Sequence, residues 1–379
     1  MDGDTAPDAA GRPEVWRAAV HVPGAAVALA RAAERDGFDG LSFGDTQHLA
    51  ADPFVGLALA ATATERLGLM VGVTNPVTRH PAVTAAAIAS VQLVSGGRAV
   101  LGVGRGDSSL AHLGRPPAPV EATEHFVAQV QAYLRGEAPG EPGHPSPLGW
   151  LGTTGQPKVP LDVAATGPRM LAAGAALAER VTVNVGADPA RVAWAVAAVR
   201  RAAPPGAVPS LGAYLVVAAH PDPAVARELA RGPVGAYAHF PGMPGGGGAP
   251  LDEADRRVVV AVARDYDLTG HGRREGRHVA HLTDDFVDRY AVVGTPEACA
   301  ERLAALAALG LDRFLLVEGA DARRPDEQQE AHHHLVREVL PVLRPWSSTG
   351  GPADRWTGAT EARGRRAARD AGPRAPGAG

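Results

Sequence analysis

Short apolar runs alternate with alanine-rich helical stretches along most of the chain, and each pair is closed by a glycine or a polar residue. Clear examples are ATATERLGLMVGVTN, SVQLVSGGRAVLGVGRGD and LAALAALGLDRFLLVEG. Strands that alternate with helices through short loops are typical of βαβ units and a parallel sheet. The pattern therefore predicts an α/β protein built from repeated strand and helix pairs.

The clearest unit contains the segment HPAVTAAAIASVQLVSGG, whose apolar residues have helical spacing. Pro81 stands near its start and Gly96 at its end, as helix entry and exit favour. The residues that carry the helical spacing are Val83, Ala87, Val91 and Val94. Strands are expected at 15–22, 40–44, 69–74, 98–103, 160–165, 181–185, 210–218 and 312–317.

Eight strands, each followed by a helical segment, fit a (β/α)8 TIM barrel with insertions in the loops that follow the strands. A doubly wound sheet is the competing arrangement. The two would place their active sites differently, so the motifs at the strand ends have to be weighed against both.

Two stretches rich in glycine and proline interrupt the alternation of strands and helices. Residues 136–159 predict a long loop over one end of the barrel. Residues 233–285 interrupt the unit after the seventh strand, and their run of four glycines predicts an active-site lid. The barrel is expected over residues 14–344, between a flexible segment at 1–13 and a disordered basic tail at 345–379 that is rich in Gly, Pro, Ala and Arg.

The composition predicts a soluble globular protein, because 45% of the 379 residues are hydrophobic and no apolar run is long enough to cross a bilayer. The first residues lack the basic and apolar regions of a secretory signal, so a cytoplasmic location is expected. The net charge of −4 combines a basic tail with an acidic body, which argues against nucleic acid as a partner. Cys299 is the only cysteine and is expected to be a small buried helix residue.

Three glycines at every second position occur in LGVGRGDSSL, at the end of the fourth expected strand. A dinucleotide-binding loop needs G-x-G-x-x-G leading into a helix, whereas here Asp107 stands in place of the last glycine and three prolines follow before the next good helix. In a barrel these residues lie at the C-terminal face, where catalytic groups collect and glycines let a flat cofactor approach the backbone. Asp107 is then a candidate catalytic acid in the mouth, with a loop or helix-capping role as the alternative.

Three further motifs are weaker. GLSFG matches the nucleophile elbow of hydrolases, but Ser42 lies inside an apolar run and no helix follows, which disfavours a serine hydrolase. The histidines at 332–334 point in different directions on a helix and RHVAH lacks a third ligand, so no metal is expected. In ATGPRM, a strand ends where Pro168 opens a helix; the free N–H groups there form an anion site that Arg169 could reinforce, with ordinary capping as the alternative.

The segment GVTNPVTRHPAVTAAAIASVQLVSGGRAVLGVGRGD resembles the bacterial-luciferase-like superfamily of flavin and deazaflavin oxidoreductases. It is most similar to the methylenetetrahydromethanopterin reductase branch, which uses coenzyme F420. GFDGLSFGD, ATGPRMLAAG and LGLDRFLLVEG extend the resemblance over most of residues 14–344. The resemblance implies a (β/α)8 barrel that holds the deazaflavin ring against a bulge in strand three, with a non-proline cis peptide between Gly72 and Val73.

The resemblance also implies site residues. Asp107 matches the acidic residue after strand four and is the candidate proton donor or acceptor. Asp45 matches the acidic position after strand two, and Asp45 and His48 are expected to orient the ring or the substrate, although this chain reads GDTQH where many relatives have Asp and His together. The residues expected at the cofactor are Gly72, Val73, Thr74, Asn75, Gly104, Gly106, Ser108, Thr166, Gly167, Pro168 and Arg169.

The expected function is hydride transfer between a deazaflavin, coenzyme F420, and a small organic substrate, reducing C=N or C=C or acting in reverse. One alternative is a monooxygenase with the same barrel, which uses FMN as its reduced flavin together with oxygen. A barrel that binds flavin without catalysis is another. A homodimer is expected, and neither nucleic acid nor a membrane is an expected partner.

Overall fold

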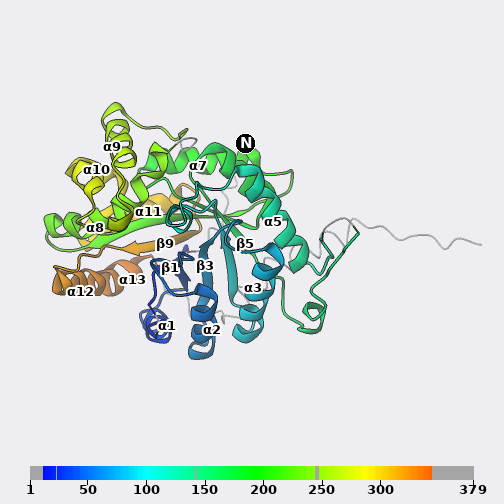
Figure 1. Ribbon diagram of the computed structural model, residues 1–379. Helices are drawn as coiled ribbons and strands as arrows, with labels where there is room; N and C mark the ends of the chain where they lie inside the picture. Colours follow the sequence, from blue (N-terminus) through cyan, green and yellow to red (C-terminus); the bar gives the residue numbers. More distant parts are fainter. Residues whose placement is uncertain (1–11, 23, 141–142, 244–246, 344–379) are drawn as a thin grey trace, which may run out of the picture.

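The computed structural model describes residues 12–22, 24–140, 143–243 and 247–343, and within them eight parallel strands close into a barrel (Figure 1). Each strand pairs with the next around the ring, and the pairing of the last strand with the first closes it. The predicted TIM barrel is confirmed, and the doubly wound sheet was the wrong alternative. The strands are β1 (Glu14–Ala19), β2 (Gly40–Phe43), β3 (Gly68–Thr74), β4 (Ala99–Val103), β5 (Leu161–Ala165), β6 (Arg180–Val183), β7 (Ser210–Ala219) and β9 (Arg313–Glu318).

Helices on the outside connect the strands, and several begin at a proline that follows an aspartate. The side chains of Asp52, Asp188 and Asp222 accept hydrogen bonds from first-turn N–H groups, which satisfies donors that the helix leaves free. The connecting helices are α1 (Ala26–Arg35), α2 (Pro53–Ala63), α3 (Pro81–Ser95), α5 (Val120–Leu134), α6 (Pro168–Leu177), α7 (Pro189–Ala202), α8 (Pro223–Ala238), α11 (Pro296–Ala308), α12 (Pro325–His334) and α13 (Leu340–Val342).

Helix α3 forms where the sequence predicts it, but its buried face is a different one. Val83 and Val94, two of the four residues with the predicted spacing, are 56% and 51% exposed. The core contacts come from residues such as Ala85, Ile88 and Ala89. The helix is apolar on most sides, so its spacing could not indicate which side faces the strands.

Two short elements are additional to the prediction. Strand β8 (Val292–Gly294) pairs with the end of β7, and helix α4 (Ser108–Ala111) follows β4 directly. The sequence predicted no helix between Asp107 and residue 120, because prolines crowd that stretch. A single turn fits before the first of them.

Residues 239–290, which we call the insertion, follow α8 and carry α9 (Glu253–Arg264) and α10 (Asp284–Tyr290) together on one side of the barrel (Figure 1). The sequence predicted that this break begins at 233, whereas α8 continues through Pro233 to Ala238. Proline at that position leaves the carbonyl of Leu229 without its helical partner. The N–H of Ala320, in the loop after β9, donates to that carbonyl at 2.9 Å, which allows the helix to continue.

The long connection at 136–159 joins α5 to β5 and therefore lies at the N-terminal end of the barrel. Its described residues contain a single short 3-10 turn, Leu151–Thr153, so the prediction of a long loop is confirmed. Residues 1–11 of the segment expected to be flexible, and the expected disordered tail at 345–379, lie outside the described residues.

The barrel interior has three layers of side chains. At the N-terminal end Arg313 donates to Asp162 at 2.8 Å, and both side chains are fully buried. Above them lies an apolar layer that closes the barrel. The next layer, toward the C-terminal mouth, consists of small side chains that are partly exposed. The apolar layer is Trp16, Met70, Val100, Tyr214 and Leu315, and the layer above it includes Ala18, Gly72 and Ala164.

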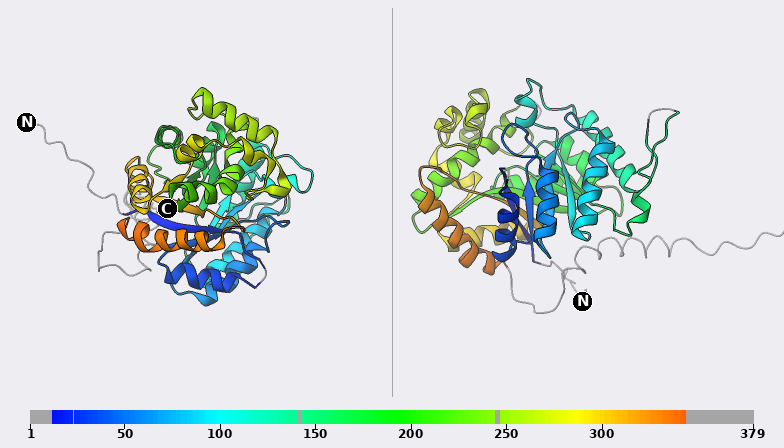
Figure 2. Two further views of the ribbon diagram at one scale, coloured as in Figure 1. Left: turned by 90° about the vertical axis from the view of Figure 1, so that its left-hand side faces the viewer. Right: turned by 60° about the horizontal axis from the view of Figure 1, so that its bottom comes forward.

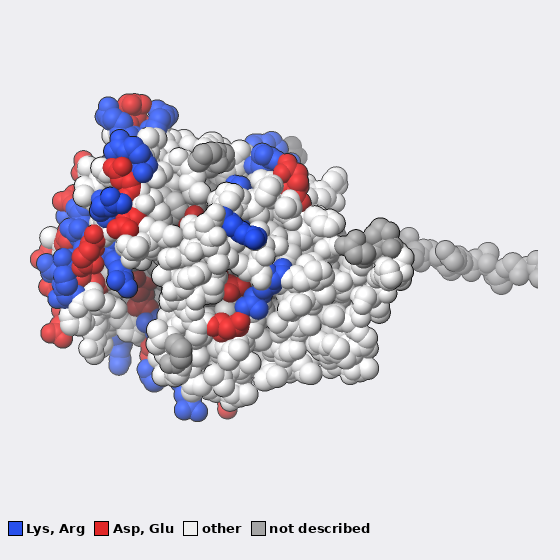
Figure 3. Space-filling model, in the orientation of Figure 1, with Lys and Arg blue, Asp and Glu red and all other residues white. Residues whose placement is uncertain are grey.

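The first and last described elements lie side by side, with α12 next to β1 and α1 (Figure 2). Charged side chains gather over α8, α9, α10 and α12, whereas the face over α2, α3 and α5 is largely without charge (Figure 3). None of the described helices is long and apolar enough to cross a membrane.

Candidate active site

Asp107 stands at the C-terminal end of β4, immediately before α4, in the position of a helix N-cap. Its carboxylate makes no capping hydrogen bond. The backbone carbonyl of Asp107 accepts from the N–H groups of Leu110 and Ala111 instead. The side-chain atom Oδ2 lies 3.0 Å from Nε2 of His239, the first residue of the insertion. The helix-capping alternative for Asp107 is therefore wrong, and its carboxylate instead joins the loop after β4 to the insertion.

The glycines after β4 allow close backbone approach. A Cβ atom on Gly104 would come within 2.9 Å of the Val73 side chain. Gly106 has a φ of +79°, which favours glycine, and a Cβ there would come within 2.7 Å of Leu110. The loop that carries Asp107 therefore lies directly against the end of β3.

Strand β3 is irregular at the same level. Its pairing with β4 shifts register between Val71 and Thr74, and the peptide bond between Gly72 and Val73 is cis. Both features agree with what the resemblance implied. A Cβ on Gly72 would come within 2.0 Å of the Ser42 hydroxyl and 2.7 Å of the Tyr214 hydroxyl. Ser42 is thus a buried barrel residue, as expected from the apolar run around it.

Asp45, after β2, is buried and belongs to a separate network. Its Oδ2 accepts a hydrogen bond of 2.7 Å from the Thr74 hydroxyl and one of 3.2 Å from Nε of Arg79. Arg79 also donates to Asp52 at 2.6 Å, which fixes the guanidinium between two carboxylates. The structure therefore brings Asp45 together with Thr74 and not with Asp107.

Asn75 and Ser108 belong to a hydrogen-bonded group that joins three loops. The Asn75 amide donates to the Ser109 hydroxyl at 3.3 Å, and its carbonyl oxygen accepts two backbone N–H groups of its own loop. The Ser108 hydroxyl lies 3.4 Å from that of Thr46. These contacts fix the loops after β2, β3 and β4 relative to one another.

His48 lies at the rim of this region. Its side chain is exposed, and its ring stacks on His112 at 4.9 Å between centroids. The preceding residue, Gln47, donates to the backbone carbonyl of Ser109 at 2.8 Å. His48 contacts neither Asp45 nor Asp107 among the hydrogen bonds of the described residues.

The expected phosphate segment forms the start of α6. Gly167 is the N-cap without a side-chain bond, Pro168 opens the helix, and Thr166 is half-buried. Arg169 is exposed and forms an ion pair with Glu121 of α5. Gly248, from the glycine run of the insertion, packs against Pro168. The structure thus brings Gly248 to the segment where the sequence predicted an anion site.

The insertion contributes residues that the sequence analysis missed. The His239 ring is 3% exposed and lies between Phe240 and Tyr266, with centroids 4.2 and 4.0 Å away. The Tyr266 hydroxyl is hydrogen-bonded to Nδ1 of His271, and the Tyr266 ring also packs on His278 at 4.5 Å. Only the clustering of histidines and aromatic residues within the insertion could have indicated them, because their partner lies 132 positions earlier.

The upper barrel presents the small side chains that a flat heteroaromatic ring would need beside it. The interior residues at this level are small and partly exposed, notably Ala18, Gly72 and Ala164. Two buried polar atoms at the mouth, Nδ1 of His239 and Nε2 of His112, have no hydrogen-bond partner among the described residues. A ring with carbonyl and N–H groups along its edge would occupy the space and supply partners. The chemistry of the residues present therefore suits a flavin or deazaflavin.

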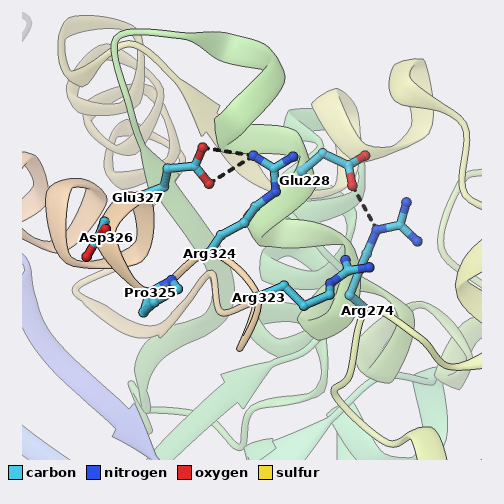
Figure 4. Close-up of a pocket in the computed structure, with 7 residues that line it drawn as sticks. All are labelled: Glu228, Arg274, Arg323, Arg324, Pro325, Asp326 and Glu327. Atoms are coloured by element: carbon cyan, nitrogen blue, oxygen red, sulfur yellow. Dashed lines mark hydrogen bonds and ion pairs between the residues drawn. The ribbon is translucent and has the colours of Figure 1, made fainter.

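A separate hollow of about 650 Å³ lies between α8 and the start of α12 (Figure 4). Arg274 donates to Glu228 at 2.9 Å, and Arg324 pairs with Glu327 at 2.8 Å. Each of these arginines therefore has a carboxylate partner within the hollow. Positive and negative side chains balance in this hollow, so it does not favour the binding of an anion.

Residues 5–313 match the family model described as luciferase-like monooxygenase. The chain belongs to this family. A 5,10-methylenetetrahydromethanopterin reductase of Methanolobus tindarius is 28% identical to this luciferase-like protein over 296 residues, which cover 76% of the chain and 87% of the relative.

Solved structures of several other proteins share the barrel. The coenzyme F420-dependent tetrahydromethanopterin reductase of Methanopyrus kandleri gives a TM-score of 0.69 at 22% identity, covering 88% of this chain and all of that one. An F420-dependent secondary alcohol dehydrogenase, solved with an F420–acetone adduct, gives 0.68 at 18% identity with the same coverage. A riboflavin lyase solved with modified FMN gives 0.61 at 18%, covering 92% and 96%. The first two of these proteins are described as F420-dependent and the third is solved with modified FMN. The reductases matched in sequence support an oxidoreductase.

Proposed function

We propose that this luciferase-like protein transfers a hydride between carbon 5 of coenzyme F420 and a carbon centre of a small organic substrate. In the reductive direction the substrate bond is C=N or C=C. The observation that carries the proposal is the carboxylate of Asp107, which is withdrawn from helix capping and held at the mouth above a layer of small residues. The similarity to methylenetetrahydromethanopterin reductases over most of the chain supports F420 as the cofactor.

When bound, the deazaflavin would supply or accept the hydride, while the protein provides orientation, a dry site and proton transfer. Gly72 and Val73 would contact the ring, with Gly104 and Gly106 allowing the loop after β4 to approach it. Thr74 and Asn75 would lie beside the ring, and Asp45 would orient it through its hydrogen bond to Thr74.

The remaining contacts would hold the cofactor phosphate and the substrate. The N–H groups at the start of α6, after Thr166 and Gly167, suit a phosphate, and Arg169 would add charge once released from Glu121. Ser108 would contact the cofactor beside Asp107, and His48 would act at the rim on the substrate. The insertion would close the mouth as a lid, since Gly248 packs on Pro168 and His239 reaches Asp107.

Parallel titrations of the purified protein with F420 and with FMN, followed by quenching of cofactor fluorescence, test the cofactor. Micromolar binding of F420 with much weaker FMN binding is expected. Consumption of reduced F420 with 2-cyclohexen-1-one or 2-methyl-1-pyrroline would then identify the reducible bond. Binding of neither cofactor would overturn the assignment.

The second candidate is an FMN-dependent monooxygenase, which the description of the family as luciferase-like monooxygenase favours. In that case FMN would bind more tightly than F420, and the protein with reduced FMN would consume oxygen in the presence of substrate. Cofactor binding without turnover of any donor would instead favour the non-catalytic flavin-binding barrel.

A further inference from the structure

The hydrogen bond between Asp107 and His239 joins the end of β4 to the start of the insertion. Its length is 3.0 Å between Oδ2 and Nε2. The Asp107 side chain is 21% exposed, and the His239 side chain is 4% exposed. One carboxylate oxygen is therefore engaged by a buried ring, while the partial exposure of Asp107 leaves the carboxylate accessible from the mouth.

Packing fixes the orientation of the His239 ring. Phe240 and Tyr266 lie close to it, with centroid distances of 4.2 and 4.0 Å. Nδ1 is buried and has no hydrogen-bond partner among the residues that the structure describes. A neutral ring with its proton on Nε2, donated to Asp107, is the form that leaves no buried N–H group unsatisfied.

The other titratable groups around this pair remain neutral near pH 7. Burial raises the pKa of Tyr266, and the negative charge of Asp107 raises it further. Burial lowers the pKa of His271 to about 4. Burial also lowers the pKa of His278 and of His112. Among these groups, His239 alone is hydrogen-bonded to the Asp107 carboxylate.

We propose that His239 is the positioning residue for Asp107, because its neutral Nε2–H group orients the carboxyl group and stabilises the carboxylate left after proton transfer. This inference rests on the proposed function, in which Asp107 exchanges a proton with the substrate while the cofactor exchanges the hydride. In the reductive direction, the O–H bond of the Asp107 carboxyl breaks and its proton forms a new bond to the substrate atom next to the hydride acceptor.

The carboxylate left on Asp107 accepts the hydrogen bond of Nε2–H of the neutral His239 ring, which stabilises its negative charge. It regains its proton from hydronium when the mouth opens, so that an O–H bond of hydronium breaks and the carboxyl O–H bond forms. No electrons move in these steps, because both electrons travel with the hydride. In the oxidative direction each proton moves the opposite way.

Nitrogen-15 NMR of the full chain labelled at histidine tests the coupling without substrate or cofactor. Asp107→Asn should move the Nε2 resonance of His239 at pH 7, because the ring loses the charged acceptor of its hydrogen bond. The His239→Asn spectrum assigns the resonance. Asp265→Asn is the matched control, since Asp265 bonds His281 at 2.6 Å in the same insertion. An unchanged Nε2 resonance of His239 in Asp107→Asn would overturn the inference.

Turnover of reduced F420 with 2-cyclohexen-1-one gives the second readout. His239→Asn should lower kcat about tenfold and move one limb of its pH profile, while the Kd for F420 stays within about twofold. His281→Asn should leave both kcat and the pH profile unchanged. If Asp107→Asn slows turnover but His239→Asn changes neither kcat nor the profile, the inference fails and the proposed function stands. If neither variant slows turnover, the role of Asp107 in the proposed function fails, and the Nε2 resonance of His239 alone decides on the coupling.

Discussion

Gly72 and Asp107 both depend on residues far away in the sequence. Gly72 has to lack a side chain, and Asp107 needs a distant hydrogen-bond partner. Gly72 lies against the hydroxyls of Ser42 and Tyr214, where a methyl group has no room. Asp107 depends on a histidine 132 positions later for its hydrogen bond. Both residues therefore have their local roles decided by distant segments.

Replacing Asp107 by Asn should lower turnover about 100-fold, because the amide cannot exchange the proton that a carboxyl group can. Cofactor affinity should change little, since Asp107 would act on the substrate. Steady-state kinetics with reduced F420, beside a fluorescence titration of the same variant, checks both. Wild-type turnover in Asp107→Asn would contradict its assigned role.

Gly72→Ala should reduce both the free energy of unfolding and F420 binding. The added methyl would collide with the Ser42 and Tyr214 hydroxyls, and overpacking of this kind costs about 1–3 kcal/mol. Gly44→Ala is the matched control at the same level, because its nearest neighbour would be a backbone oxygen at an ordinary 3.8 Å. Urea denaturation of both variants tests the difference, and equal losses would contradict it.

His271 should make stability depend on pH. Burial lowers its pKa to about 4 from an ordinary 6.5, so the unfolded chain binds a proton more readily than the folded one between these values. Its contribution is present above about pH 6.5 and is lost as the pH falls toward 4, with roughly 1–2 kcal/mol lost between pH 7 and 5. His271→Asn should therefore lose less stability than the wild type over that interval, as measured by urea denaturation at each pH. Parallel losses would show that His271 does not carry the dependence.

At the scale of strands and helices, a polar layer closes the N-terminal end of the barrel. Arg313 of β9 donates to Asp162 and Thr182, on β5 and β6, and to the Ser210 hydroxyl on β7. Four strands thus share one guanidinium that is fully buried. Because every partner comes from a different strand, the layer favours a single arrangement of the strands at this end.

Arg313→Met should destabilise the protein by about 3–5 kcal/mol, because it removes the cation that is hydrogen-bonded to the buried Asp162 carboxylate and leaves only Arg180, 3.9 Å away. Combining it with Asp162→Leu should recover much of that loss, since the unpaired charge is then removed. Urea denaturation of the single and double variants measures both. A double variant no more stable than the single one would show that the loss comes from packing rather than charge.

Most strands and helices could be predicted from the sequence, because the periodicity of apolar residues and the glycines and prolines at element ends are local signals. The exceptions have physical causes. Pro233 fails to end α8 because Ala320 takes the carbonyl that it releases. Strand β8 is only three residues long and exists through its pairing with β7. The buried face of α3 could not be assigned because most of its surface is apolar.

Features of the candidate site could be predicted where a single motif contains them, but not where they depend on contacts between two distant segments. The cis peptide at Gly72 and the loop after β4 lie within a single recognisable stretch. The contact of Asp107 with His239 and that of Asp45 with Thr74 depend on how loops pack, which no spacing encodes. His48 follows from the resemblance alone, and the structure leaves it exposed at the rim.

At the scale of the whole molecule, charge is unevenly distributed. The side that carries α8, α9, α10 and α12 is dense in both signs, and the face over α2 and α3 is nearly bare (Figure 3). Helices α2 and α3 contain no charged residue, and several of their large apolar side chains are exposed. The exposed side chains are Val55, Leu59, Val83, Leu93 and Val94.

This uncharged face should pair with the same face of a second copy, because a contiguous apolar surface on a monomer marks an interface and a twofold axis would bury it on both copies. We expect sedimentation velocity to show a dimer. Leu59→Arg should shift the protein to monomer, whereas Val260→Arg, at an exposed valine of α9, should not. A wild-type protein that stays monomeric at tens of micromolar would contradict the expectation.

The bond between Asp107 and His239 also constrains how such a protein can diverge. The carboxylate belongs to the barrel, and its histidine belongs to a segment that follows α8. A chimaera that receives the insertion of a relative would acquire, in the same exchange, a new partner for this aspartate. Under the proposed function, changes of substrate range and of proton chemistry would thus be inherited together, and a transplanted insertion would need a histidine at its first position to work on this barrel.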